Sequence, residues 1–185
     1  MWEALRYDWS RLRAMGSAIG VPAAIEEMRC ATSKSQSDDA YWRIDNIVVV
    51  QGSLYEAAAP TAACLVTALP SCSRVSRSNF LDLLFQLGNG EPNEVEIALG
   101  NGRLDEVCRA ELVRAFGVYI SILEESVASD CSTDFYHCLD LLVICVVADR
   151  SLKNRIAWYY QKVLDVGYSR GRDAVRSHLQ EISKM

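Results

Sequence analysis

Turn-forming residues are scarce in this sequence, because its 185 residues include only 10 Gly and 4 Pro. An all-β protein needs a turn about every 8–12 residues, so this scarcity excludes that class and favours helices joined by short connections. Half of the residues are hydrophobic and 23% are charged, which excludes wholesale disorder. The length suits one sizeable core, and we expect a single helical domain over residues 1–185.

Long apolar runs are absent as well. The most apolar stretch, Cys138–Ala148, carries Asp140 and is shorter than the roughly 18 residues that a bilayer span needs. We therefore expect a buried core helix there. Charges at Glu3, Arg6 and Asp8 occupy positions where a signal peptide has its apolar run. The sequence thus predicts a cytoplasmic protein that does not contact a membrane.

The seven cysteines show no disulfide or zinc pattern. Their odd number and the absence of a signal-like N-terminus favour free thiols in a reducing compartment. Cys131, Cys138 and Cys145 recur every seven residues, so the last two are expected on one helix face. A zinc site would need further ligands, and His137 lies on a different face from Cys138. We expect thiols in the core, with no metal and no cofactor.

Catalytic motifs are also missing. The two histidines, His137 and His178, are far apart, and neither belongs to a His-x-x-x-His zinc helix. No Gly-x-Ser-x-Gly elbow, nucleotide-binding loop or glycine fingerprint occurs. Adjacent carboxylates such as Asp38 and Asp39 point about 100° apart on a helix and do not share a substrate. We therefore expect a binding protein without catalytic residues. An enzyme whose site has no recognisable motif is the remaining functional class.

Apolar residues recur at helical spacing along most of the chain. The predicted helices cover residues 2–15, 22–31, 38–50, 55–69, 79–87, 104–127, 134–149, 153–166 and 173–183. Two Gly-Asn-Gly triplets, at 88–90 and 100–102, are expected to form flexible turns around the short segment 94–99.

Two places leave the helix assignment open. The β-branched run Ile47–Val50 alone favours a strand, but it continues the helical spacing of Tyr41 and Ile44, so we predict a helix. Pro60 lies inside the helix predicted over 55–69, where it either kinks that helix or marks its true first turn.

Eight or nine helices with short connections favour antiparallel hairpins stacked as an α-solenoid, at roughly 35–45 residues per helix pair. The pairs do not align convincingly with one another, so any repeat is degenerate. A compact, non-repeating helical bundle is the alternative.

Charge is unevenly distributed along the chain. Residues 51–130 contain 5 Lys and Arg against 11 Asp and Glu, a net charge of −6 within a total of −5. An acidic surface repels nucleic acid and attracts a basic partner, although an ordinary solvated helix face is an equally simple explanation. The first interpretation places the contact at the loop before position 104 and its flanking helix, with these residues: Glu91, Glu94, Glu96, Asp105 and Glu106.

One stretch has a recognisable signature. Residues 41–60 read YWRIDNIVVVQGSLYEAAAP. This resembles the tyrosine-tryptophan … glutamine-glycine-x-x-tyrosine-glutamate-alanine signature of small bacterial HEAT-repeat-like proteins. Residues 108–113 and 119–123 are similar to a later helix of the same group. The resemblance covers roughly residues 36–125, and residues 131–185 diverge from it.

The resemblance implies an all-α fold of antiparallel helix hairpins, stacked as a short, degenerate HEAT-like α-solenoid. Proteins of this group are binding scaffolds, and some are immunity proteins of contact-dependent and other polymorphic toxin systems. We therefore expect an immunity protein that binds and neutralises a basic toxin domain, a cytoplasm-acting nuclease, without touching nucleic acid itself. A general adaptor or assembly subunit that binds a peptide or protein is the alternative.

The signature suggests further contact residues. Trp42, Tyr55 and Glu56 are candidates for a partner-facing edge, because aromatic anchors dominate binding energy. The simpler alternative is that Tyr41 and its neighbours pack the helix while Gly52 allows a left-handed turn.

Overall fold

The computed structural model describes residues 1–129 and 132–185, and these residues are mostly helical, as predicted. The α-helices are α1 (Val21–Arg29), α2 (Lys34–Val48), α3 (Ala58–Ala68), α4 (Arg77–Asn89), α5 (Glu94–Ala98), α6 (Leu104–Val113), α7 (Phe116–Ser129), α8 (Ser132–Ala148), α9 (Lys153–Asp165) and α10 (Arg172–Lys184). The strands are β1 (Val49–Val50), β2 (Ser53–Leu54) and β3 (Glu91–Pro92). Short 3-10 helices cover Glu3–Arg6, Ala18–Gly20, Leu69–Ser71 and Arg150–Leu152.

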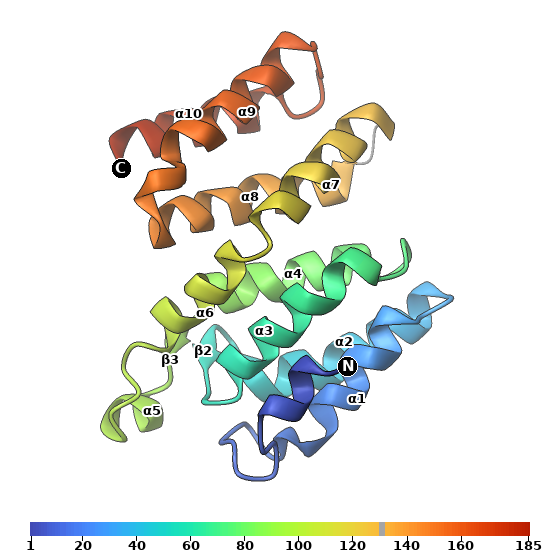
Figure 1. The fold of residues 1–185 in the computed structure, drawn as a ribbon, viewed down its shortest axis with the longest axis vertical. Helices are drawn as coiled ribbons and strands as arrows, with labels where there is room; N and C mark the ends of the chain where they lie inside the picture. The colour runs from blue at the N-terminus through green and yellow to red at the C-terminus, as the bar shows by residue number, and fades with distance from the viewer. Residues whose placement is uncertain (130–131) are drawn as a thin grey trace.

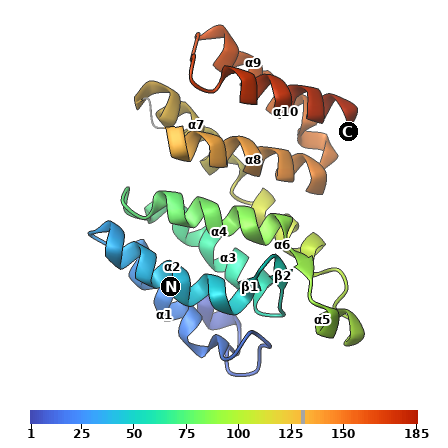
Figure 2. The same cartoon turned by 180° about the vertical axis from the view of Figure 1, so that it is seen from behind.

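The helices are stacked in pairs along the long axis of the molecule (Figure 1). The pairs are α1 with α2, α3 with α4, α7 with α8, and α9 with α10. Helices α2, α4, α8 and α10 form one row, in which each packs against the next (Figure 2). On the other side α1 packs against α3, and α3 against α6. The first and last pairs therefore lie at opposite ends of the stack.

Helix α8 is the centre of this packing, because it contacts α4, α6, α7, α9 and α10. Every residue from Cys138 to Val146 is buried except Asp140, so the core helix predicted at 138–148 is confirmed. Gly88 lets α4 approach closely, since a Cβ at this position would lie 2.8 Å from Leu112 and 2.9 Å from Ile144. Helix α4 continues through Gly88 and ends at Asn89, within the Gly-Asn-Gly triplet where the sequence predicted a stop.

The helix predicted over residues 2–15 was wrong. Only Glu3–Arg6 is helical, as a 3-10 turn, and the indole Nε1 of buried Trp9 donates to the Ala4 carbonyl at 2.8 Å. Leu5 is exposed, whereas Ala4 and Trp9 are buried in the core without a continuous helix between them. The backbone N–H of Arg13 instead donates to the Glu56 carboxylate, 43 residues later.

The ambiguous run divides between a helix and a strand. Helix α2 begins after Ser33, whose hydroxyl caps it, and ends at Val48. Val49–Val50 then pair with Ser53–Leu54 as an antiparallel hairpin, and β2 pairs in parallel with β3. Gly52 takes a positive φ of 78° in this turn, as predicted. The helical assignment of the last two valines was wrong.

Two further boundaries differ from the prediction. Helix α3 begins at Ala58, so Pro60 lies in its first turn, where a missing N–H costs nothing. The helix predicted over 104–127 is divided at residues 114–115. There Arg114 and Ala115 donate to the carbonyls three residues earlier, which tightens and ends α6. The break lets α6 pack against α3 while α7 packs against α8.

Six of the seven cysteines lie among the described residues. Among the described residues, Cys30, Cys64, Cys72, Cys108, Cys138 and Cys145 form no disulfide, whereas Cys131 lies outside the described residues. Within the described part of the chain, no helix has the length and apolar character needed to cross a bilayer.

Helix α10 is attached to α8 through an imidazole. His178 Nε2 lies 2.8 Å from Asp140 Oδ1, and Nδ1 lies 2.8 Å from the Ala174 carbonyl. Both nitrogens face acceptors, so the doubly protonated ring suits the site. The hydrogen bond to Asp140 raises the pKa of His178, against the opposing effect of burial, with Glu181 adding a smaller attraction.

We predict that His178→Gln reduces the stability of the protein in acid more than in base. The pKa of His178 is higher in the folded state than in the unfolded state, so protonation of its ring stabilises the fold. This stabilisation is fully present below the unfolded-state pKa of about 6.5 and is lost as the pH rises through the folded-state pKa. Urea midpoints of the wild type and the variant should therefore differ most near pH 5.5 and converge above pH 8. An equal difference at both pH values would contradict the charged pair.

Candidate protein-binding face

A polar pocket of about 470 Å³ opens on the row formed by α2, α4 and α8. Tyr41 and Trp42 reach it from α2, Asp82 from α4 and His137 from α8. The row faces the viewer in Figure 2. Helical spacing explains the convergence on α4, where Asp82, Gln86 and Asn89 share one face.

The carboxylate of Asp82 is the centre of the pocket. Its Oδ2 accepts the Tyr41 hydroxyl at 2.5 Å and Gln86 Nε2 at 3.0 Å, while its Oδ1 lies 3.5 Å from His137 Nε2. The interaction with His137, followed by those with Tyr41 and Gln86, outweighs burial and lowers the pKa of Asp82 to about 2. Burial, reinforced by the Asp82 carboxylate, raises the pKa of Tyr41. Asp82 is thus a fixed negative charge at neutral pH.

An aromatic wall borders this charge. The Trp42 ring is 54% exposed and meets the Tyr41 ring edge to face, with centroids 4.9 Å apart at 90°. Tyr41 itself is buried, so its ring fixes the base of the Trp42 side chain. An exposed indole that packs against a buried aromatic ring is a suitable contact anchor.

Two more carboxylates extend the charge along α2. Asp38 Oδ1 accepts both Lys34 Nζ and Asn79 Nδ2. Asp45 lies two turns further along the helix, and its Oδ1 is buried with no hydrogen-bond partner among the described residues. Burial, together with the charge of Asp82, raises the pKa of Asp45.

The arginines of these helices are turned away from the pocket. Arg43 of α2 pairs with Glu27 of α1, and Arg77 of α4 pairs with Glu125 of α7 at 2.9 Å. Helix α8 contains neither Lys nor Arg. The carboxylates of the pocket are therefore opposed by Lys34 and by His137, the other basic side chains that line it.

The acidic loop lies at the end of the same helices. Glu91 belongs to β3, Glu94 begins α5, and both are exposed. They line a second hollow of about 580 Å³, which Asn89 of α4 also lines. Since Asn89 shares a helix face with Asp82, the two hollows follow one surface. We call this surface the acidic face and define it by Asp38, Trp42, Asp45, Asp82, Glu91 and Glu94.

Glu96 does not belong to the acidic face, and its predicted partner-binding role was wrong. Its side chain is 1% exposed and is fully engaged within the protein. Arg13 Nη2 lies 2.7 Å from Oε2, Asn101 Nδ2 donates to Oε2 at 3.0 Å, and the Glu56 N–H donates to Oε1 at 3.2 Å. Burial opposes ionisation, but these donors together lower the pKa of Glu96.

The remaining predicted contact residues are partly engaged within the chain. Glu56 is half-buried. Its Oε2 accepts the backbone N–H of Arg13 at 3.1 Å and lies 3.1 Å from Nη1 of the Arg13 guanidinium. Tyr55 is half-buried, and its hydroxyl accepts Asn93 Nδ2 at 3.5 Å. Asp105 pairs with Arg109 at 3.0 Å.

Glu106 likewise pairs with Arg103, at the start of α6. Of the eight predicted residues, Trp42, Glu91 and Glu94 are thus exposed on the acidic face. The sequence prediction missed Asp38, Asp82 and His137 as pocket residues, and it missed Asp45 further along α2. The sequence alone shows which of these residues share a face within one helix, through their i, i+4 and i+7 spacing. It does not show that α2, α4 and α8 bring those faces together.

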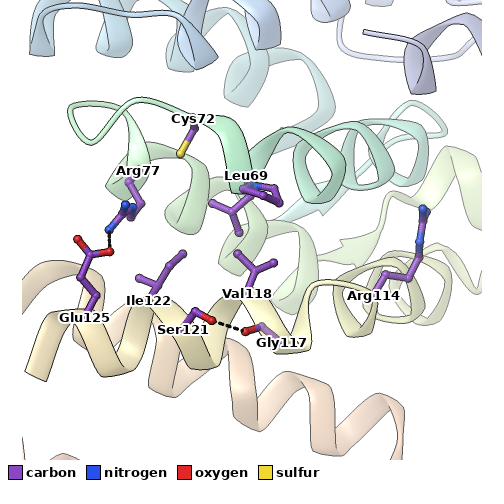
Figure 3. A pocket seen from close by; sticks show the side chains of 10 residues that line it. Leu69, Cys72, Arg77, Arg114, Gly117, Val118, Ser121, Ile122 and Glu125 are labelled. Carbon is purple, nitrogen blue, oxygen red and sulfur yellow. Dashed lines mark hydrogen bonds and ion pairs between the residues drawn. The ribbon is translucent and has the colours of Figure 1, made fainter.

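A third hollow, of about 470 Å³, lies between the end of α3 and α7 (Figure 3). Leu69, Val118 and Ile122 form its apolar part, and Arg77 and Arg114 lie at its two ends. Both cations are already paired, Arg77 with Glu125 and Arg114 with Glu111. The hollow therefore offers little uncompensated charge to a ligand.

Comparisons of the chain with protein-family models, with curated proteins and with solved structures give no match in any of the three. The function is therefore inferred from the geometry of the acidic face and from the signature at residues 41–60.

We predict that Glu96→Gln lowers the free energy of unfolding by about 2 kcal/mol, because a buried charged pair loses one partner while Arg13 keeps access to water. Glu94→Gln, an exposed change in the same short helix, should alter it by less than about 0.5 kcal/mol. Urea denaturation at pH 7 measures both variants. Equal effects would show that Glu96 is not a structural carboxylate.

Proposed function

We propose that this chain is an immunity protein that binds a basic bacterial toxin domain through the acidic face and neutralises it by sequestration. The observation that carries the proposal is the segregation of charge on α2, α4 and α8. Carboxylates surround the exposed Trp42, while Arg43 and Arg77 pair on other sides of the same helices. A surface of this kind attracts a basic partner and repels nucleic acid.

The partner class follows from the same charge. A nuclease carries basic residues to grip phosphates, so an acidic inhibitor both covers those residues and speeds the encounter. Inhibition by covering needs no catalytic group on the inhibitor. A cytoplasm-acting nuclease domain is therefore the toxin class that we favour.

We also propose that the fold is a short, degenerate HEAT-like α-solenoid. The stacking of four helix pairs, with α2, α4, α8 and α10 in one row, supports this description. Two features depart from a regular repeat: the insertion of β3 and α5 after α4, and the break between α6 and α7. The acidic face lies on the row, next to that insertion.

A general adaptor is the second candidate, and one observation favours it. An apolar groove of about 320 Å³ lies between α7 and α9, bordered by Trp158, Val127 and Val166. Trp158 is 56% exposed, as an anchor for a peptide or protein would be. This groove carries no comparable excess of carboxylates, so it fits a different partner from the acidic face.

The proposal expects a toxin gene beside the gene for this chain, and the test uses a catalytically inactive form of the toxin domain that such a gene encodes. We predict that Glu91→Lys/Glu94→Lys slows association at least about tenfold at low salt and leaves dissociation nearly unchanged. The effect should shrink as salt rises, because charges are screened over about 8 Å at 0.15 M. Stopped-flow fluorescence across a salt series measures both rates.

The matched control is Glu124→Lys/Asp165→Lys, an equal charge change at exposed positions of α7 and α9. It should slow association much less than the acidic-face variant. Unchanged low-salt rates for Glu91→Lys/Glu94→Lys, or equal slowing by the control, would contradict the acidic face as the contact.

A further inference from the structure

We propose that the pocket between α2, α4 and α8 receives an arginine side chain of the partner. The inference rests on the proposed function, because it names the chemical group that the acidic face recognises. Its evidence is the arrangement of acceptor oxygens and aromatic rings in one cavity of about 470 Å³.

Each of two carboxylates in the pocket uses one oxygen to hold the scaffold and keeps the other available. Asp82 accepts Tyr41 and Gln86 on Oδ2, which leaves Oδ1 with only the 3.5 Å contact to His137. Both hydrogen bonds that Asp38 accepts from the described residues go to Oδ1, which leaves Oδ2 open. Asp38 Oδ2 and, beside its long contact with His137, Asp82 Oδ1 are therefore the acceptors that the pocket offers to a partner's donor.

The walls favour a flat cation over a compact one. A guanidinium is planar, carries five N–H donors and stacks on aromatic faces, whereas an ammonium is a point charge that binds water strongly. Trp42 offers an exposed ring, and the edge-to-face contact with Tyr41 holds that ring beside the carboxylates. Cation–π attraction and charge-assisted hydrogen bonds then act on the same group.

Anionic ligands do not suit this pocket. Asp82 stays ionised because its pKa is lowered, and Lys34 is already bound to Asp38. A phosphate or carboxylate would therefore be repelled by Asp82 and would gain little from Lys34, whose charge Asp38 already compensates.

The experiment titrates the full chain with N-acetyl-arginine amide and follows the indole N–H resonances by NMR. Trp42→Phe identifies the Trp42 signal among the four tryptophans. The arginine amide should shift the Trp42 resonance in a saturable manner and leave the Trp158 resonance in place. N-acetyl-citrulline amide, which has a similar planar shape without the charge, should bind at least about fivefold more weakly.

Two asparagine variants locate the binding. Asp82→Asn should raise the dissociation constant of the arginine amide at least about fivefold. Asp39→Asn removes the same charge from an exposed position on another face of α2, and it should leave the constant within about twofold. Equal weakening by both variants, or equal binding of the citrulline amide, would overturn the proposal.

A third variant guards against misfolding of Asp82→Asn. Trp42→Ala changes an exposed ring, and saturation transfer from the protein to the arginine amide should drop at least about threefold in this variant. Undiminished transfer would show that the cation binds elsewhere.

The two proposals can fail separately. If the arginine amide does not bind the pocket while Glu91→Lys/Glu94→Lys still slows toxin association, the arginine pocket is wrong and the immunity function stands. If the arginine amide binds as described but the toxin domain does not associate with the chain, the pocket stands and the immunity function is wrong.

Discussion

The buried carboxylate of Glu96 joins parts of the chain that are far apart in sequence. Arg13 of the N-terminal segment, the backbone of Glu56 at the corner before α3, and Asn101 after α5 all donate to it. Removing this acceptor would leave a buried N–H without a partner and an arginine without its carboxylate. The short helix α5 has little core of its own, so this ionic junction holds the insertion in place. The exposed position of Glu91 and Glu94 beside α4 depends on it.

The same pairing of charges within the fold shapes the acidic face. Arg43 is drawn to α1 and Arg77 to α7, so helix packing removes cations from the row of α2, α4 and α8. Asp82 remains there as a fixed charge, oriented by Tyr41 and Gln86. Buried and half-buried ion pairs stabilise the scaffold only modestly, but their placement decides which surface carries uncompensated charge. That uncompensated charge is the basis of the proposed function.

Local patterns in the sequence predicted most helices and failed where distant contacts decide the structure. Apolar periodicity located most of the helices, including the central α8, because each buries its own apolar stripe. The short helix α5 was not predicted, since Glu96 and not an apolar residue is its buried side chain. Apolar periodicity failed over residues 2–15, where Arg13 bonds to carboxylates 43 and 83 residues away. It also failed at residues 114–115, where neither Gly nor Pro marks the break. Charge counting found Glu91 and Glu94 but could not separate them from Glu96, since only the fold buries the latter. The pocket around Asp82 forms where three helices meet, and no local sequence pattern predicts that meeting.

Hydrogen exchange of the chain bound to the toxin domain tests the central claim most directly. Amides that a partner covers exchange more slowly, so the protected segments map the contact. The acidic face predicts added protection in α2, α4, β3 and α5, with α7 and α9 unchanged. Added protection confined to α7 and α9, around the groove of Trp158, would contradict the claim that the acidic face is where this protein binds.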